Sequence, residues 1–179
     1  MASEREIINL YCGMEKVFGE YSFWIREMTV FTVSGVKGRA AVIERFRHTA
    51  NNIADNFKSY YPVSICDRIR DLYAERALII IEAVRAYTYE NSALYDDALL
   101  MLTDNNRGIA SYFFEIDPVY GADAIRNYLG RNTEYIVQQL KRRFAGEFDG
   151  EIASFDLCYS NMIDMADYVS AAILQTVLE

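Results

Sequence analysis

Apolar residues recur at helical spacing along almost the whole chain. In residues 7–28 they lie three and four positions apart, which is the repeat of one face of an α-helix. The same spacing runs through residues 42–57, 67–87, 94–116, 125–140 and 155–173. The strict alternation that is typical of half-buried strands is absent. The pattern therefore predicts five or six helices that are joined by short connections.

The two prolines of the chain indicate an internal duplication. Pro62-Val63 and Pro118-Val119 lie at equivalent places in two similar segments, and at this offset eight of the 18 residues 53–70 are identical to their partners. So many identities in so short a segment are typical of a repeat. We therefore predict two related helical hairpins, around residues 42–88 and 98–144.

These patterns predict an all-α fold, with residues 1–179 forming a single helical-bundle domain. We expect an antiparallel bundle of five or six helices with an internal pseudo-repeat of helical hairpins, packed as in four-helix and ferritin-like bundles. A chain of 179 residues buries enough apolar surface to fold without disulfides. Because Cys12, Cys66 and Cys158 are odd in number and far apart, we expect free thiols.

Charge is distributed unevenly along the sequence. The net charge is −8, and residues 144–179 contain seven acids but no lysine or arginine. Such a field repels nucleic acid and favours basic partners or cations. The chain begins with acids where a signal peptide needs a basic and then an apolar run, and no apolar run is long enough to span a membrane. We therefore expect a cytoplasmic protein with no nucleic-acid or membrane partner.

The motifs of the common catalytic and cofactor sites are missing. Neither a glycine-rich phosphate loop nor HExxH occurs, and the single histidine cannot supply the two ExxH pairs of a di-iron bundle. We therefore expect no cofactor and favour a protein that is not an enzyme. A site built from carboxylates alone stays open.

Polar residues interrupt the apolar stripes at equivalent places in the two hairpins. Thr49 and Asn105 are repeat partners, and so are Arg76 and Asn132. Buried polar groups need partners, and a buried arginine needs a carboxylate above all. We therefore predict one interior cluster, which is either a structural polar layer or a site for a small polar ligand. Its members are Trp24, Glu27, Thr49, Arg76, Asn105, Asn132 and Asp156.

A second polar line follows the helix expected over residues 42–57. Glu44, His48, Asn52 and Asp55 are spaced so that they share one helix face. Such a line is usually a solvated face, although one imidazole with carboxylates can bind a metal. The alternative metal site that we consider consists of Glu27, His48 and Asp156.

Several short motifs occur in a characteristic order. They are Trp24-Ile-Arg-Glu27, Arg47 with Asn51-Asn52 and Asp55, Tyr60-Tyr61, Glu75-Arg76-Ala77, Asn105 before Ile109-Ala110, Asp117-Pro118, Gly146-x-Phe148-x-x-Glu151-Ile152-x-x-Phe155-Asp156 and Met165-Ala166-Asp167. This order resembles an uncharacterised family of small all-helical proteins from Firmicutes. The resemblance implies an antiparallel bundle and no activity. Where that family has three histidines, this chain has Glu27, Arg76 and Asn132, which implies a Glu27–Arg76 ion pair in place of a metal site.

These observations lead to two hypotheses on function. The first is a non-enzymatic cytoplasmic binding or assembly protein that forms a homo-oligomer, with a small polar ligand or a basic protein as its partner. The alternative is a metal-binding or metal-dependent bundle that uses interior carboxylates.

Overall fold

The apolar stripes form helices in the structure, a computed structural model that describes residues 2–178. Its α-helices are α1 (Glu4–Ser34), α2 (Arg39–Arg47), α3 (Thr49–Phe57), α4 (Val63–Thr88), α5 (Ser92–Ile116), α6 (Ala122–Ala145) and α7 (Phe148–Ile173). A 3₁₀ turn, η1 (Pro118–Tyr120), precedes α6, and a π-helical turn, η2 (Leu174–Leu178), follows α7. Residues 2–178 contain no strand, so the predicted all-α class is confirmed. None of these helices combines the length and apolarity that crossing a bilayer requires.

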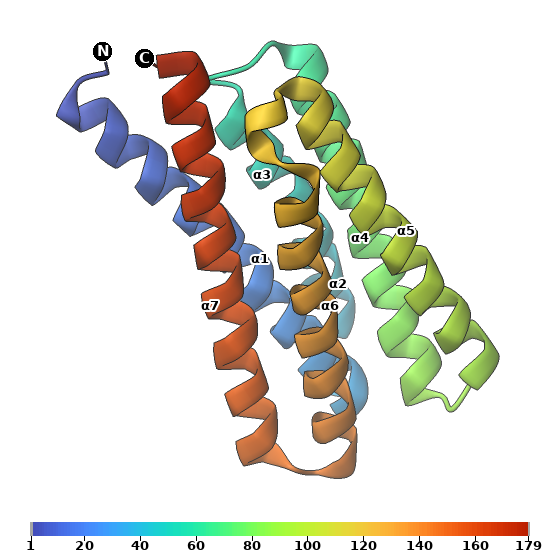
Figure 1. Ribbon diagram of the computed structural model, residues 1–179. Coiled ribbons are helices and arrows are strands. Elements are labelled where there is room, and N and C mark those ends of the chain that lie inside the picture. The colour runs from blue at the N-terminus through green and yellow to red at the C-terminus, as the bar shows by residue number, and fades with distance from the viewer. Residues whose placement is uncertain (1, 179) are drawn as a thin grey trace.

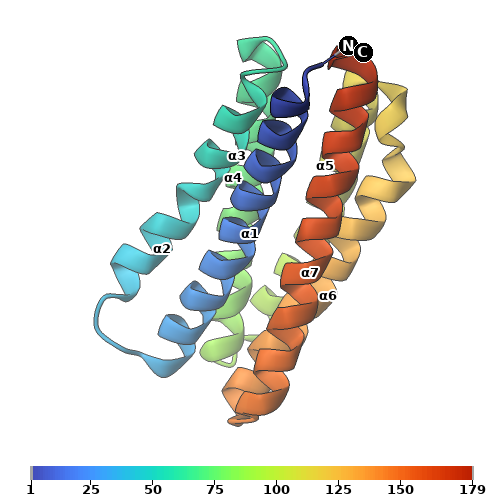
Figure 2. The same ribbon diagram turned by 90° about the vertical axis from the view of Figure 1, so that its left-hand side faces the viewer.

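The helices pack as an antiparallel bundle (Figures 1 and 2). Helix α1 packs against α2, α3 and α4 on one side and against α7 on the other. Helix α5 lies between α4 and α6, and α6 pairs with α7. Both ends of the chain therefore lie at the same end of the bundle (Figure 2).

Local sequence signals set the helix ends. The Ser3 hydroxyl accepts from the Glu6 N–H, and the Glu6 carboxylate accepts from the Ser3 N–H, which is a capping box at the start of α1. Helices α2 and α3 are separated by His48 alone, where the Thr49 hydroxyl donates to the Phe46 carbonyl oxygen at 2.6 Å. When α2 and α3 are counted as one interrupted helix, residues 2–178 form six α-helices, which agrees with the predicted five or six.

One continuous apolar core runs through the bundle, and aromatic rings fill much of it. Near η1, the Phe113 ring lies 5.8 Å from the Phe57 ring and 5.1 Å from the Tyr120 ring. Farther along, the Tyr21 and Tyr73 rings meet edge to face at 5.8 Å. Edge-to-face rings of this kind add about 0.5–1.5 kcal/mol per pair beyond the area that they bury.

The two predicted hairpins correspond to α2–α4 and α5–α6. Near their starts, α4 and α6 carry equivalent ion pairs, Asp67–Arg70 and Asp123–Arg126, each with an N–O distance of 2.7 Å. These pairs fit the predicted repeat, but they are also ordinary i, i+3 helix pairs. The duplication itself stays a prediction.

Candidate functional site

Arg76 lies in the middle of α4 with its side chain fully buried. Its Nη2 donates to Asn132 Oδ1 at 2.9 Å and to Thr133 Oγ1 at 3.1 Å, and its Nη1 donates to Asn106 Oδ1. All three acceptors are neutral, and within residues 2–178 no carboxylate forms an ion pair with Arg76. Burying a charge costs several kcal/mol of hydration, to order of magnitude. Fixed amide oxygens offset part of that cost.

The hydrogen bonds continue from Arg76 to neighbouring helices. Asn132 Nδ2 donates to Cys158 Sγ on α7 at 3.2 Å, and Asn106 Nδ2 donates to Thr133 Oγ1 at 3.3 Å. We use the name Arg76 layer for the buried polar cluster that these groups form with two tyrosines. Its members are Tyr21, Tyr73, Arg76, Asn106, Asn132, Thr133 and Cys158.

The acidic groups of the Arg76 layer stay neutral. Burial raises the pKa of Tyr21 to about 12 and that of Cys158 to about 11, and it also raises the pKa of Tyr73. The Tyr21 and Tyr73 hydroxyls and Arg76 Nε are buried and have no hydrogen-bond partner within residues 2–178. The layer connects α4, α5, α6 and α7 through hydrogen bonds, and Tyr21 of α1 packs against Tyr73 within it.

Only part of the predicted interior cluster comes together. Arg76 and Asn132 bond directly, as expected. Asn105 instead donates to the Leu72 carbonyl oxygen at 3.1 Å, and its neighbour Asn106 contacts Arg76. Thr49 is fully buried, but its hydroxyl donates to the Phe46 carbonyl oxygen at the α2–α3 break instead of joining the cluster.

The predicted ion pair between Glu27 and Arg76 is wrong. The Glu27 side chain is 26% exposed, and its carboxylate lies 3.9 Å from Arg26. Asp156 is exposed on α7 and lies outside the interior. The buried carboxylate of α7 is Glu151, which pairs with Arg26 Nε at 2.7 Å. Rotation of α7 about its axis turns Glu151 inward and Asp156 outward.

Trp24 also lies outside the Arg76 layer. Its ring is partly exposed and is covered by the Arg45 guanidinium at 4.9 Å, with the Phe23 ring 5.2 Å away. These contacts belong to the surface between α1 and α2.

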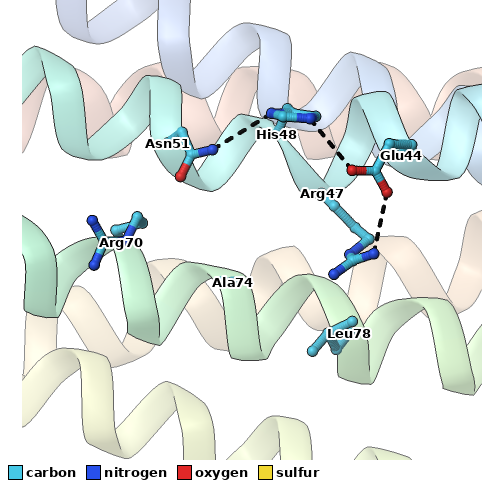
Figure 3. Close-up of a pocket in the computed structure, with 7 residues that line it drawn as sticks. All are labelled: Glu44, Arg47, His48, Asn51, Arg70, Ala74 and Leu78. Carbon is cyan, nitrogen blue, oxygen red and sulfur yellow. Dashed lines mark hydrogen bonds and ion pairs between the residues drawn. The ribbon is translucent and has the colours of Figure 1, made fainter.

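His48 lines a shallow surface pocket of about 240 Å³ between the α2–α3 segment and α4 (Figure 3). Glu44 Oε1 lies 3.3 Å from His48 Nε2, and Arg47 Nη1 donates to Glu44 Oε2 at 3.1 Å. Arg70 lies on the opposite wall of this pocket. Two guanidinium groups repel a metal cation, so this pocket is unsuited to one.

The polar line along α2 and α3 does not act as one unit. Asn52 Nδ2 donates to Glu20 at 3.2 Å, and Asp55 pairs with Lys58 at 2.6 Å. Among residues 2–178, no group of three or more His, Cys, Asp and Glu side chains is placed to hold a metal ion. The structure therefore does not bring Glu27, His48 and Asp156 together.

The exposed side of α7 carries an apolar stripe that the bundle leaves uncovered. Phe148 is 53% exposed, Ile152 46% and Tyr159 42%, and on neighbouring α1 Phe23 is 43% exposed. Tyr159 packs so closely on α1 that a Cβ built at Gly19 would lie 2.9 Å from its hydroxyl. Exposed apolar groups that are contiguous mark interaction sites more often than single ones do.

Unpaired acids flank this stripe. Asp149 and Asp156 are exposed, and neither of them forms an ion pair with a residue of the described chain. We use the name aromatic–acidic face for the stripe and its acids together. It consists of Phe23, Phe148, Ile152, Phe155, Tyr159, Asp149 and Asp156.

Rings of the aromatic–acidic face already bind guanidinium groups. The Arg26 guanidinium lies 5.1 Å from the centre of the Phe155 ring, and that of Arg143 lies 4.9 Å from the centre of the Phe148 ring. Stacked arginines of this kind contribute about 0.5–1 kcal/mol each at exposed sites. The face is therefore chemically suited to basic side chains.

Comparisons with known proteins found no match among protein-family models, curated proteins or solved structures. The resemblance to the family from Firmicutes thus stays a prediction.

The sequence did not predict that Asn106, Thr133 and Cys158 belong to the Arg76 layer. Asn106 follows Asn105, which lies on the predicted stripe, and this position next to the stripe is the sequence signal that could have indicated Asn106.

Proposed function

We propose that this chain is a non-enzymatic binding protein whose aromatic–acidic face takes up a basic, amphipathic helix of a partner protein. The observation that carries the proposal is the exposed stripe of Phe148, Ile152 and Tyr159 with unpaired aspartates at its edge. A helix that presents apolar side chains to this stripe and basic side chains to the acids complements it in both respects.

Charge favours a basic partner over a second copy of the chain. Residues 144–179 contain seven acids and no basic residue. A symmetric dimer through this face would bring Asp149 and Asp156 near those of the second α7, and of the two arginines beside the face Arg26 already pairs with Glu151. Like charges that meet at an interface cost free energy, so the face disfavours its own copy.

The Arg76 layer supports this proposal as a structural element. It ties α7 to α4, α5 and α6 through buried hydrogen bonds and so fixes the rotation of the helix that carries the face. Buried polar contacts can specify register in helical assemblies in this way. A rigid face binds a partner with less loss of conformational entropy.

A labelled synthetic helix of leucine, lysine and arginine tests the proposal. Fluorescence anisotropy would measure its dissociation constant, with a peptide that has glutamate in place of each basic residue as the charge control. The variant Phe148→Ser/Ile152→Ser removes two half-exposed side chains, each worth about 1 kcal/mol when fully covered. We therefore expect about a thirtyfold weaker complex.

Matched changes elsewhere on the surface distinguish specific docking from general attraction. Leu100 is 67% exposed on α5, so Leu100→Ser removes a comparable apolar group outside the face. We expect this control to bind the basic helix as the unmodified protein does. Equal losses in both variants, or equal binding of the acidic peptide, would overturn the proposal. A dimer that Phe148→Ser/Ile152→Ser dissociates would also overturn it, in favour of self-association.

A further inference from the structure

A second, separate pocket lies where the last turns of α4 and α6 meet the first turn of α5. It has a volume of about 340 Å³, and its lining includes the side chains of Tyr87, Tyr95 and Phe144. The Tyr87 ring lies 5.0 Å from the Tyr95 ring and 5.3 Å from the Phe144 ring, at steep angles to both. Three rings that stand at such angles around a pocket present aromatic faces in several directions.

The pocket favours positive charge. Glu90 lies on its rim, and the seven described residues that line it include no lysine or arginine. The C-terminal turns of α4 and α6 both end beside it, where helix dipoles place partial negative charge, and the arginines of these turns, Arg85, Arg142 and Arg143, do not line the pocket. The opposing N-terminus of α5 is capped, because Asn91 Oδ1 accepts from the Leu94 N–H at 3.2 Å.

Glu90 holds an unusual backbone conformation in this place. Its φ is +57°, and it is the single residue other than glycine with positive φ among the described residues. The turn after α6 has the same pair of capping hydrogen bonds, with Gly146 at the corresponding position. A non-glycine residue that is kept in this strained region points to a use for its side chain.

Tyr95 forms the α5 side of the pocket. Only 7% of the residue is exposed, and its hydroxyl is closed to solvent. A molecule in the pocket can therefore contact Tyr95 only through its ring.

We propose that Tyr87, Tyr95 and Phe144 form an aromatic cage for a quaternary ammonium group, with the Glu90 carboxylate as its counter-charge. Aromatic faces attract such cations, which are too poorly hydrated to favour water strongly. The cage lies on other elements than the aromatic–acidic face and does not depend on it.

Isothermal titration of the whole protein with choline chloride tests the cage. We expect saturable binding, and about tenfold weaker binding of 3,3-dimethylbutanol, which has the shape of choline without its charge. Equal binding of the two compounds, or no saturable binding of either cation probe, would overturn the proposal. Trimethyllysine serves as the second cation probe. Tighter binding of choline would indicate that the quaternary ammonium group belongs to a free metabolite, and tighter binding of trimethyllysine would indicate that it belongs to a modified lysine side chain.

Variants assign the binding to the cage. Phe144 is 43% exposed, so Phe144→Leu should fold while it loses the aromatic face, and we expect a dissociation constant about tenfold higher. Glu90→Gln removes the counter-charge and should also weaken binding of choline but not of the neutral compound. Phe114→Leu is the matched control, because Phe114 is 47% exposed and lies outside the pocket. Unchanged binding in Phe144→Leu, or an equal loss in Phe114→Leu, would contradict the proposal.

Discussion

Replacing Glu90 by glycine should make the protein more stable, although it removes a side chain. At φ +57° the glutamate pays the steric cost of the left-handed region, about 1–2 kcal/mol. Glycine avoids that cost, but it gives the unfolded chain more conformational freedom, which lowers the free energy of unfolding by about 0.5–1 kcal/mol. Glu90 is exposed and forms no ion pair within the described residues, so little else changes. The net gain is about 0.5–1 kcal/mol.

Urea denaturation followed by circular dichroism measures this change. We expect a higher midpoint with an unchanged slope, and a Tm that is higher by about 1–4 °C for a chain of this length. Gly146→Ala is the reciprocal control, because φ there is +76° and a Cβ would meet no atom within 4 Å. That change adds strain without a clash and should destabilise the protein by about 1 kcal/mol. A less stable Glu90→Gly protein would refute the strain argument, and so would a Gly146→Ala protein of unchanged stability.

Three further predictions concern the interior. Arg76→Ala should lower the free energy of unfolding by about 2–4 kcal/mol, because it leaves buried amide oxygens without donors. Urea denaturation of Arg76→Ala, Asn132→Leu and the double variant should show that the two changes are strongly coupled. Additive changes in the free energy of unfolding would contradict the hydrogen bond between the two side chains. Of the three cysteines only Cys12 is exposed, so Ellman's reagent should modify one thiol per native chain and three in urea; fast reaction of two or more native thiols would contradict the burial. Since burial raises the pKa of Cys158 to about 11 from 9.0, the unfolded thiol ionises first, and the free energy of unfolding should fall as pH rises from 9 to 11. Cys158→Ala should reduce that slope, and an unchanged slope would count against the shifted pKa.

Helix positions followed from the sequence because apolar spacing reports periodicity directly. The contact between Arg76 and Asn132 could also be predicted, since both interrupt stripes at the centre of a buried face. Asn105 and Asn106 show the limit of this reasoning. Adjacent residues lie about 100° apart around a helix, so spacing alone does not decide which of the two meets a third helix.

The aromatic–acidic face could not be predicted from the sequence because α7 is apolar on more than one side. Phe155 and Tyr159 belong to the same sequence stripe as Met162 and Val169, which are buried, yet Phe155 is half-buried and Tyr159 is exposed. Which side of such a helix meets the bundle depends on α1 and α6, and residue spacing along α7 carries no information about them.

The central claim is that the aromatic–acidic face binds a basic helix, and chemical-shift mapping tests it most directly. Amide spectra of ¹⁵N-labelled protein would be recorded as the basic peptide is added. We predict saturable shifts that cluster on residues 148–160 of α7 and on the neighbouring part of α1 around Phe23. Shifts that are spread over all acidic surfaces, or that cluster away from α7, would contradict the account.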